Sequence, residues 1–205
     1  AKAKAVQGTE AEKKDFTSKQ MLCRPSFWMA FLGISFLAAV GSSVISFAKD
    51  LAISVNAPEA LAVSLVGVLS ICNGLGRILT GALFDTLGRR KTMLLANLLT
   101  IVAAAVTLLA VTIGSLPLCI AGLCLTGMSY GSCPTIMTAF TSSFFGMKYL
   151  STNVAIMTFT VMVGSLIAMV SNKVLELTGG YPATFMMLLA LTFAALVLNV
   201  MIKKA

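Results

Sequence analysis

The chain has 205 residues, of which 58% are hydrophobic and only 11% are charged. A soluble domain is typically about 25% charged, so this composition excludes a soluble enzyme, a disordered chain and a disulfide-stapled secreted module, and it indicates that lipid is the main solvent. The sequence contains no His, which excludes a His-based metal site, a Ser-His triad and a His proton relay within this chain.

The charged residues point to a membrane surface. The net charge is +8, from 15 Lys and Arg against 7 Asp and Glu. In a soluble protein this balance would suggest a nucleic-acid partner, but here the basic residues stand at the ends of apolar runs, so we expect lipid and no nucleic acid. The five cysteines lie in or beside apolar segments without zinc spacing or a disulfide framework, and we interpret them as small hydrophobic residues. We predict no metal and no cofactor.

Residues 1–25 are predicted to be a cytosolic linker. They are polar and lack the apolar core of a signal peptide. Residues 9–15 have the composition of a short surface helix, although a solvated segment beside anionic lipid headgroups is the favoured interpretation. Trp28, which follows Arg24 and Pro25, is suited to anchor the first apolar run at the membrane interface.

Six apolar runs are long enough to cross a bilayer core of about 30 Å, which takes roughly 20 helical residues. They cover residues 27–48, 60–84, 92–112, 116–140, 149–172 and 181–202. The third and fourth runs come from one uncharged stretch that the sequence Gly-Ser-Leu-Pro at 114–117 divides. We therefore predict an all-α integral membrane protein whose six-helix bundle covers residues 26–203.

The basic residues also predict the orientation of the bundle. Twelve of them fall before the first run, between the second and third, between the fourth and fifth, or after the sixth, whereas two fall in the other connections. By the positive-inside rule the side with twelve is cytosolic, so both termini are predicted to be cytosolic. The expected location is the plasma (cell inner) membrane.

The six runs divide into two triplets of similar length, 27–112 and 116–202. Because each triplet has an odd number of spans, the two would be inverted relative to each other, as in the nested 3+3 repeats of secondary transporters. We therefore predict six transmembrane helices arranged as two inverted three-helix repeats.

The connection between the second and third runs holds the most informative motif, G-x-x-x-D-x-x-G-R-R-K at residues 81–91. Gly81 lies one helical turn before Asp85, which would let a neighbouring helix approach closely. Asp85 ends the run, where its carboxylate can pair with the arginine cluster or lie at the N-terminus of a nearby helix. Gly88 permits a tight reversal with positive φ, and the arginines after it hold the connection in the cytosol.

This motif resembles the loop signature of the major facilitator superfamily, which lies between the second and third helices of the first half and has a related copy in the second half. In that family the loop acts as a cytosolic latch that stabilises the outward-open state. The resemblance implies this role for Gly81, Asp85, Gly88, Arg89 and Arg90. The alternative is an ordinary basic connection that only sets topology, which would not require the Asp and both glycines.

The resemblance extends over nearly the whole chain. Residues 16–28 resemble the central cytosolic linker that enters the seventh helix in the oxalate/formate antiporter and monocarboxylate porter branch. Further matches are Asn-Gly-Leu-Gly-Arg at 73–77, Tyr-Gly at 130–131 and Phe-Gly at 145–146. The Ala at residue 1 indicates the later part of a longer protein, or a processed or engineered product. The resemblance implies the C-terminal half of a twelve-helix carrier. Its partner would be the N-terminal six-helix half of the same carrier, or a second copy.

Arg77 is the one charge deep inside an apolar run, eight residues before Asp85 and so about 12 Å along the helix. An Arg at depth costs at least ~2.5 kcal/mol on insertion scales and usually faces a cavity or a partner. A guanidinium fits a carboxylate bidentately, and in the resembled branch an Arg at this place binds the substrate carboxylate. We expect Arg77 to do so; the alternatives are snorkelling toward the cytosol or a permanent pair with an acid of the other half.

Two further side chains are candidates for the substrate site. Asn73, one turn before Arg77, can orient the guanidinium or form an interhelical hydrogen bond. Tyr130 can donate its hydroxyl to a substrate oxygen, as the resemblance implies for an aromatic residue there, or can pack within the bundle. The motif Gly127-x-x-x-Gly131 is interpreted as a close-packing surface.

These features predict a secondary active transporter, or half of one, that moves a small organic anion by alternating access. Oxalate carriers of the resembled branch have a Lys within the eleventh helix, and the run 149–172 has no Lys or Arg. A monocarboxylate such as formate, lactate or pyruvate is therefore favoured, unless the other half supplies the second cation. No run has an acidic residue near its middle, so either the other half supplies a proton carrier or the protein exchanges anions. The alternative is a non-transporting membrane scaffold or an inactive truncated carrier fragment; an enzyme is disfavoured because no cluster of His, acids or Cys is present.

Overall fold

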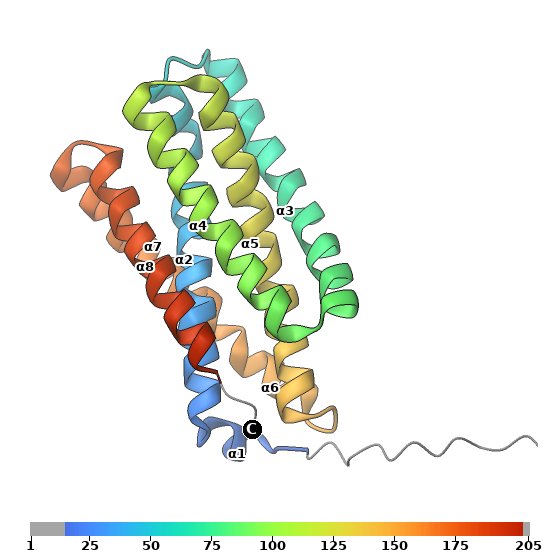
Figure 1. The fold of residues 1–205 in the computed structure, drawn as a ribbon. Coiled ribbons are helices and arrows are strands. Elements are labelled where there is room, and N and C mark those ends of the chain that lie inside the picture. Colours follow the sequence, from blue (N-terminus) through green and yellow to red (C-terminus); the bar gives the residue numbers. More distant parts are fainter. Residues whose placement is uncertain (1–14, 203–205) are drawn as a thin grey trace, which may run out of the picture.

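The computed structural model describes residues 15–202, and every regular element in that range is an α-helix (Figure 1). The helices are α1 (Ser18–Leu22), α2 (Pro25–Ser54), α3 (Glu59–Leu87), α4 (Arg89–Ile113), α5 (Leu116–Phe145), α6 (Leu150–Met157), α7 (Phe159–Thr178) and α8 (Tyr181–Met201). Six spans are long and apolar enough to cross a membrane: α2, α3, α4, α5, α6 with α7, and α8. The predicted all-α fold with six spans is therefore confirmed. The first fourteen residues of the predicted linker, and with them almost all of the possible helix at 9–15, lie outside the described residues.

Glycine and proline set the ends of the long helices. Gly114 and Gly179 adopt left-handed conformations, with φ of 72° and 65°, and end α4 and α7. A left-handed glycine at this position is a common way to terminate a helix, because it has no Cβ to clash. Proline occupies the first or second position of α2, α5 and α8, where its missing N–H leaves no hydrogen bond unmade. The predicted division at residues 114–117 is thereby confirmed.

The fifth span differs from the predicted single helix because it is interrupted at Thr158, between α6 and α7. The Thr158 hydroxyl donates a hydrogen bond to the Val154 carbonyl oxygen at 3.0 Å, and the Val161 N–H donates to the Thr158 carbonyl oxygen at 3.0 Å. The second bond is an i→i+3 bond, which tightens the turn, and hydroxyl bonds of the first kind often bend helices. Hydropathy does not register this break, because threonine is tolerated within an apolar run.

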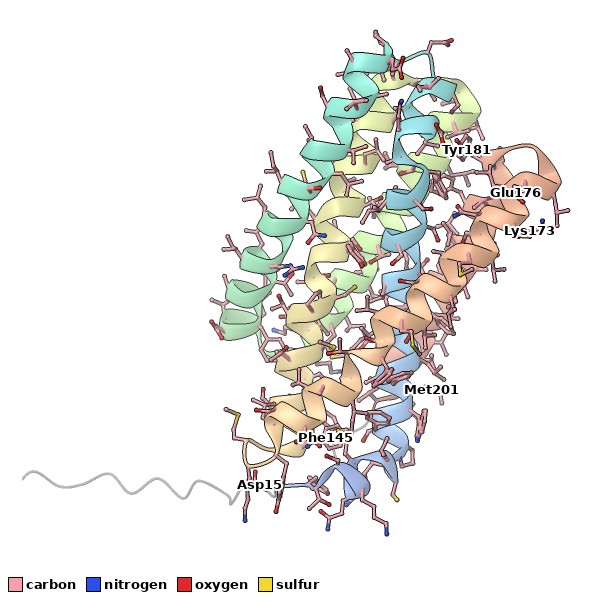
Figure 2. The ribbon with its side chains drawn as sticks, turned by 180° about the vertical axis from the view of Figure 1, so that it is seen from behind. Asp15, Phe145, Lys173, Glu176, Tyr181 and Met201 are labelled. Atoms are coloured by element: carbon pink, nitrogen blue, oxygen red, sulfur yellow. The ribbon has the colours of Figure 1, made fainter. Side chains whose placement is uncertain are left out.

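The helices form two groups around a central pair. α2 and α5 contact each other; α3 and α4 pack on α5, whereas α7 and α8 pack on α2, and α4 also contacts α8. Figure 1 looks onto α4 and α8, and Figure 2 shows the opposite face, made by α3, α5, α2 and α7. The second helix of each predicted triplet thus packs on the first helix of the other triplet. The inverted repeat itself stays a prediction.

The chain connections alternate between the two ends of the bundle. Asp15, Phe145 and Met201 lie at one end, and Lys173, Glu176 and Tyr181 lie at the other (Figure 2). The described basic residues that the positive-inside rule assigns to one side belong to segments at the first of these ends (Figure 1); they are Lys19, Arg24, Arg89, Arg90, Lys91 and Lys148.

Glycines bring α3 and α5 into direct backbone contact. A Cβ atom on Gly131 would overlap the Asn73 carbonyl oxygen, and one on Gly76 would overlap the Met128 carbonyl oxygen. A Cβ on Gly127 would lie 2.5 Å from the Leu69 carbonyl oxygen. In lipid, where helices gain little from burying apolar side chains, such close approach supplies the packing energy. The predicted close-packing role of Gly127-x-x-x-Gly131 is confirmed.

The contact between α2 and α7 has a similar character. Gly164 of α7 lies against Ala38 of α2, where an added Cβ would come within 2.9 Å of the Ala38 Cβ. One to two helical turns farther along α2 and α7, the Ser43 hydroxyl donates a hydrogen bond to the Ser171 hydroxyl at 2.9 Å. Small residues therefore hold both outer helices of the Figure 2 face to the central pair, and one hydroxyl pair adds to the α2–α7 contact.

The glycine contact predicts a position-dependent effect of a single methyl group. Gly131→Ala should lower the thermal unfolding midpoint of the purified protein, with a cost of about 1–3 kcal/mol typical of overpacking. Gly74→Ala is the matched control, because nothing lies within 4 Å of its added Cβ and alanine is the better helix former. Equal midpoints for the two variants would contradict the close contact.

Candidate functional site

Arg77 and Asn73 form the polar centre of the candidate site, on α3. The Nε of Arg77 donates a hydrogen bond to Oδ1 of Asn73 at 3.4 Å. Arg77 is exposed and Asn73 is half-buried. Among residues 15–202, the acid–base pairs within 4.0 Å are Lys49–Glu59 and Lys173–Glu176. The Arg77 guanidinium therefore has no acidic partner in the described part of the chain, and most of its five N–H donors are uncommitted.

The α3–α5 contact fixes the backbone that carries this pair. Gly131 lies against the Asn73 carbonyl oxygen and Met128 lies against Gly76, which precedes Arg77. The Thr135 hydroxyl donates a hydrogen bond to the Arg77 carbonyl oxygen at 3.4 Å. Three successive contacts from α5 thus hold the turn of α3 from residue 73 to residue 77.

The depth of Arg77 follows from its place in the helix. α3 ends at Leu87, so Arg77 lies about 15 Å from that end along the helix axis. Its exposed side chain and uncommitted donors have a favourable environment only where water, headgroups or a partner group reaches them, since an unpaired Arg in hydrocarbon is costly.

Tyr130 lies at the same level of the bundle but points to another helix. Its ring packs against Gly41 of α2, so closely that a Cβ on Gly41 would overlap it. The half-buried ring packs against the core cluster that includes Ile34 and Ile136. The structure does not bring the Tyr130 ring together with Arg77 and Asn73, and the contact with Gly41 matches the packing alternative.

Gly88 makes the tight reversal that the loop motif predicted. Its φ of 74° and ψ of 169° fall in a region that side chains rarely allow, and it ends α3 and precedes α4 directly. Its N–H donates to the Phe84 carbonyl oxygen at 3.1 Å, and its own carbonyl oxygen accepts the Thr92 N–H at 3.2 Å. One residue therefore connects two membrane-spanning helices.

Two other expectations for this motif are not met by contacts within residues 15–202. Gly81 is not a point of close approach for another helix of this chain, because the nearest atom to an added Cβ is Thr135 Cγ2 at 4.0 Å, an ordinary contact. The close approach occurs farther up α3, where Gly76 meets α5. Asp85 is exposed and forms no ion pair within the described range, so the predicted pairing with the arginine cluster does not occur there.

Arg89 has a partner that the sequence did not reveal. Its guanidinium carbon lies 3.8 Å from the centre of the Phe144 ring, near the end of α5. This cation–π contact turns Arg89 toward the bundle, whereas Arg90 is exposed. Arg89 and Phe144 are distant in sequence. The only feature of the sequence that could have indicated this contact is the aromatic pair Phe144 and Phe145 at the end of an apolar run.

The segment before α2 is docked on the connection between α5 and α6. Asp15 Oδ1 accepts hydrogen bonds from the N–H groups of Met147 at 2.9 Å and Lys148 at 3.1 Å. The Phe16 N–H donates to the Phe145 carbonyl oxygen at 2.9 Å, and the Asn153 amide donates to the Phe16 carbonyl oxygen at 3.1 Å. Figure 2 shows Asp15 and Phe145 together at this end. For residues 15–22 the expectation of a solvated linker is therefore wrong.

Comparison with known proteins agrees with this architecture. The sequence matches the Major Facilitator Superfamily over residues 2–204, and the chain belongs to that superfamily of membrane transporters. It is 30% identical over 161 residues to a protein of Escherichia coli (strain K12) described as "Uncharacterized MFS-type transporter YhjX". The match covers 75% of this chain and 38% of that relative, so the matched part spans well under half the length of the relative. The superfamily expected from the loop motif is confirmed.

The backbone at Gly88 predicts a specific sensitivity. Gly88→Ala should lower the thermal unfolding midpoint, because a side chain at this φ and ψ costs about 1–3 kcal/mol. Gly180→Ala is the matched control: its φ of −162° and ψ of 151° are open to any residue, and the nearest atom to the added Cβ is at 3.5 Å. A midpoint for Gly88→Ala equal to that of Gly180→Ala would contradict the strained turn.

Proposed function

We propose that this chain is half of a secondary active transporter that moves a small organic anion, most simply a monocarboxylate, by alternating access. Membership of the Major Facilitator Superfamily establishes the transporter class. The observation that supports the substrate class is Arg77, a cation within a membrane-spanning helix that has no acidic partner in the described part of the chain.

The Arg77–Asn73 hydrogen bond suits the recognition of a carboxylate. Because Asn73 accepts from Nε, the two terminal nitrogens of the guanidinium stay available as a parallel pair of donors. A carboxylate matches that pair with two charge-assisted hydrogen bonds, which a Lys at the same place would not provide. Asn73 would act by fixing the plane of the guanidinium, and Tyr130 would line the site from α5 without direct contact to the pair.

The number of cations favours a monocarboxylate. Arg77 is the single charge away from the ends of the described spans, and the flanking Lys148 and Lys173 lie at opposite ends of the span formed by α6 and α7. A dicarboxylate would need a second cation, and within this half none is placed to supply it.

The proposed partner is the N-terminal six-helix half of the same carrier, with a second copy of this chain as the other possibility. The match covers 38% of the relative's length, which leaves room for such a half.

The surfaces that would meet this partner are uncovered in the described residues. α3 offers Gly67 and Gly74, beside which nothing lies within 4 Å. Asp85 and Arg90 are exposed at the end of α3 and the start of α4, where a latch to the partner would form. We place this end, and both termini, in the cytosol of a cell whose plasma membrane holds the carrier.

Transport by Arg77 variants tests this function. In proteoliposomes with the protein at its full natural length, we expect uptake of labelled formate, lactate or pyruvate, and labelled oxalate serves as the dicarboxylate for comparison. Arg77→Gln should abolish that uptake because it removes the charge, and Arg77→Lys should raise KM about tenfold or more, because the paired donors are lost. Thermal unfolding midpoints would confirm that each variant is folded.

Lys173→Gln is the matched control, since Lys173 is an exposed cation at the opposite end that pairs with Glu176, and it should transport as the parent does. Uptake that survives Arg77→Gln would overturn the site. No uptake of any of the four anions by the folded parent protein would favour a different substrate class or a scaffold.

A further inference from the structure

An open hollow of about 380 Å³ lies where α1 meets the start of α2. It is lined by Phe16, Lys19, Gln20, Cys23 and Arg24. We propose that this hollow binds the phosphate of an anionic phospholipid headgroup. The proposal is independent of the substrate and of Arg77.

The positive charge of the hollow favours an anionic ligand. Lys19 and Arg24 are exposed cations, and neither lies within ion-pair distance of an acid among residues 15–202. The carboxylate nearest in sequence, Asp15, is directed away: its Oδ1 accepts the N–H groups of Met147 and Lys148. Two cations that have no acidic partner among residues 15–202 lie on one small surface, and a phosphate can accept hydrogen bonds from both.

The frame of the hollow is rigid. The Arg24 guanidinium carbon lies 5.1 Å from the centre of the Phe16 ring. Phe16 is itself buried, edge-on to Phe145 with ring centres 5.9 Å apart, and hydrogen-bonded to the Phe145 carbonyl oxygen. On the other wall, Thr17 and Gln20 close a reciprocal capping box at the start of α1. The cation at 24 is therefore held in place before any ligand arrives, which lowers the entropy cost of binding.

The position of the hollow favours a lipid as the source of the phosphate. Trp28, one turn into α2, is half-exposed, and its indole N–H donates to the Leu22 carbonyl oxygen at 2.9 Å. An exposed tryptophan beside exposed Leu22 is typical of the membrane interface. The hollow adjoins this pair on the basic side of the bundle, where anionic headgroups gather. A soluble phosphate has the same chemistry but gains nothing from the apolar neighbours.

Protection of Cys23 tests the proposal. The full chain is reconstituted in nanodiscs of phosphatidylcholine with increasing fractions of phosphatidylglycerol. The rate at which an uncharged maleimide modifies Cys23 is measured on the Cys23 peptide by mass spectrometry. Cys23 lines the hollow and is exposed, so a bound headgroup should slow its modification. Half-protection is the phosphatidylglycerol fraction at which the modification rate of Cys23 falls to half. Lys19→Gln should raise this fraction about fivefold, as expected for the loss of one juxtamembrane cation. The double variant Lys19→Gln, Arg24→Gln should lose protection.

Matched variants separate the site from general surface charge. Lys148→Gln removes an exposed cation at the same end that does not line the hollow, so half-protection should be unchanged. Lys19→Gln leaves the Arg24–Phe16 contact intact, which keeps the test valid if the double variant unfolds. Equal protection in the parent and in Lys19→Gln would overturn the proposal. Protection by inorganic phosphate in pure phosphatidylcholine, as complete as that by phosphatidylglycerol, would overturn the lipid assignment.

Discussion

The backbone contact between α3 and α5 is the constraint on which the rest of the half-bundle depends. Lipid removes the driving force that would press apolar helices together in water, so the helices must gain from direct packing. Gly76, Gly127 and Gly131 supply it by letting each backbone reach the carbonyl groups of the other. The same contact holds residues 73–77 of α3 in a fixed register on α5. Arg77 is therefore carried by one of the most tightly held parts of the fold.

This packing leaves most of α3 uncovered, and that exposure agrees with the proposed function. α3 packs on α5 through one side, while the side that carries Ser70, Gly74 and Arg77 is exposed. A helix that faced hydrocarbon over this surface would have no use for a cation at depth, since its insertion is unfavourable. A helix that lines a path between two halves needs such a group to attract an anion. The proposed carrier function accounts for the charge and for the open surface together.

The sequence predicted those features of the fold that depend on local composition. Run length and hydropathy located the six spans, Gly88 marked the reversal, and the spacing of Gly127 and Gly131 marked a packing surface. The motif around Gly88 also identified the superfamily. For the candidate site, the one-turn spacing of Asn73 and Arg77 indicated orientation of the guanidinium as one of two alternatives, and the structure shows a hydrogen bond between these side chains.

The remaining features depend on contacts between distant residues. Asp15 meets the backbone at 147 and 148, and Arg89 meets Phe144; neither pair is linked by spacing or periodicity. Gly81 was assigned a close approach because its motif spacing allowed one, yet the neighbouring helix reaches α3 at Gly76 instead. The Thr158 break arises from hydrogen bonding within a run that hydropathy reads as continuous. Tertiary packing, which a single sequence does not display, decided the first three of these features, whereas the Thr158 break is a local effect that hydropathy does not detect.

The most direct measurement of the central claim is chemical replacement of the charge at position 77. Arg77→Cys, in a protein whose other cysteines are replaced by alanine, is treated with water-soluble thiosulfonates whose adducts are equal in size and either cationic or neutral. If Arg77 binds the substrate carboxylate from a water-filled path, both reagents reach the thiol and only the cationic adduct restores part of the carboxylate uptake. A thiol that reacts only with lipid-soluble reagents, or equal uptake with both adducts, would contradict this role.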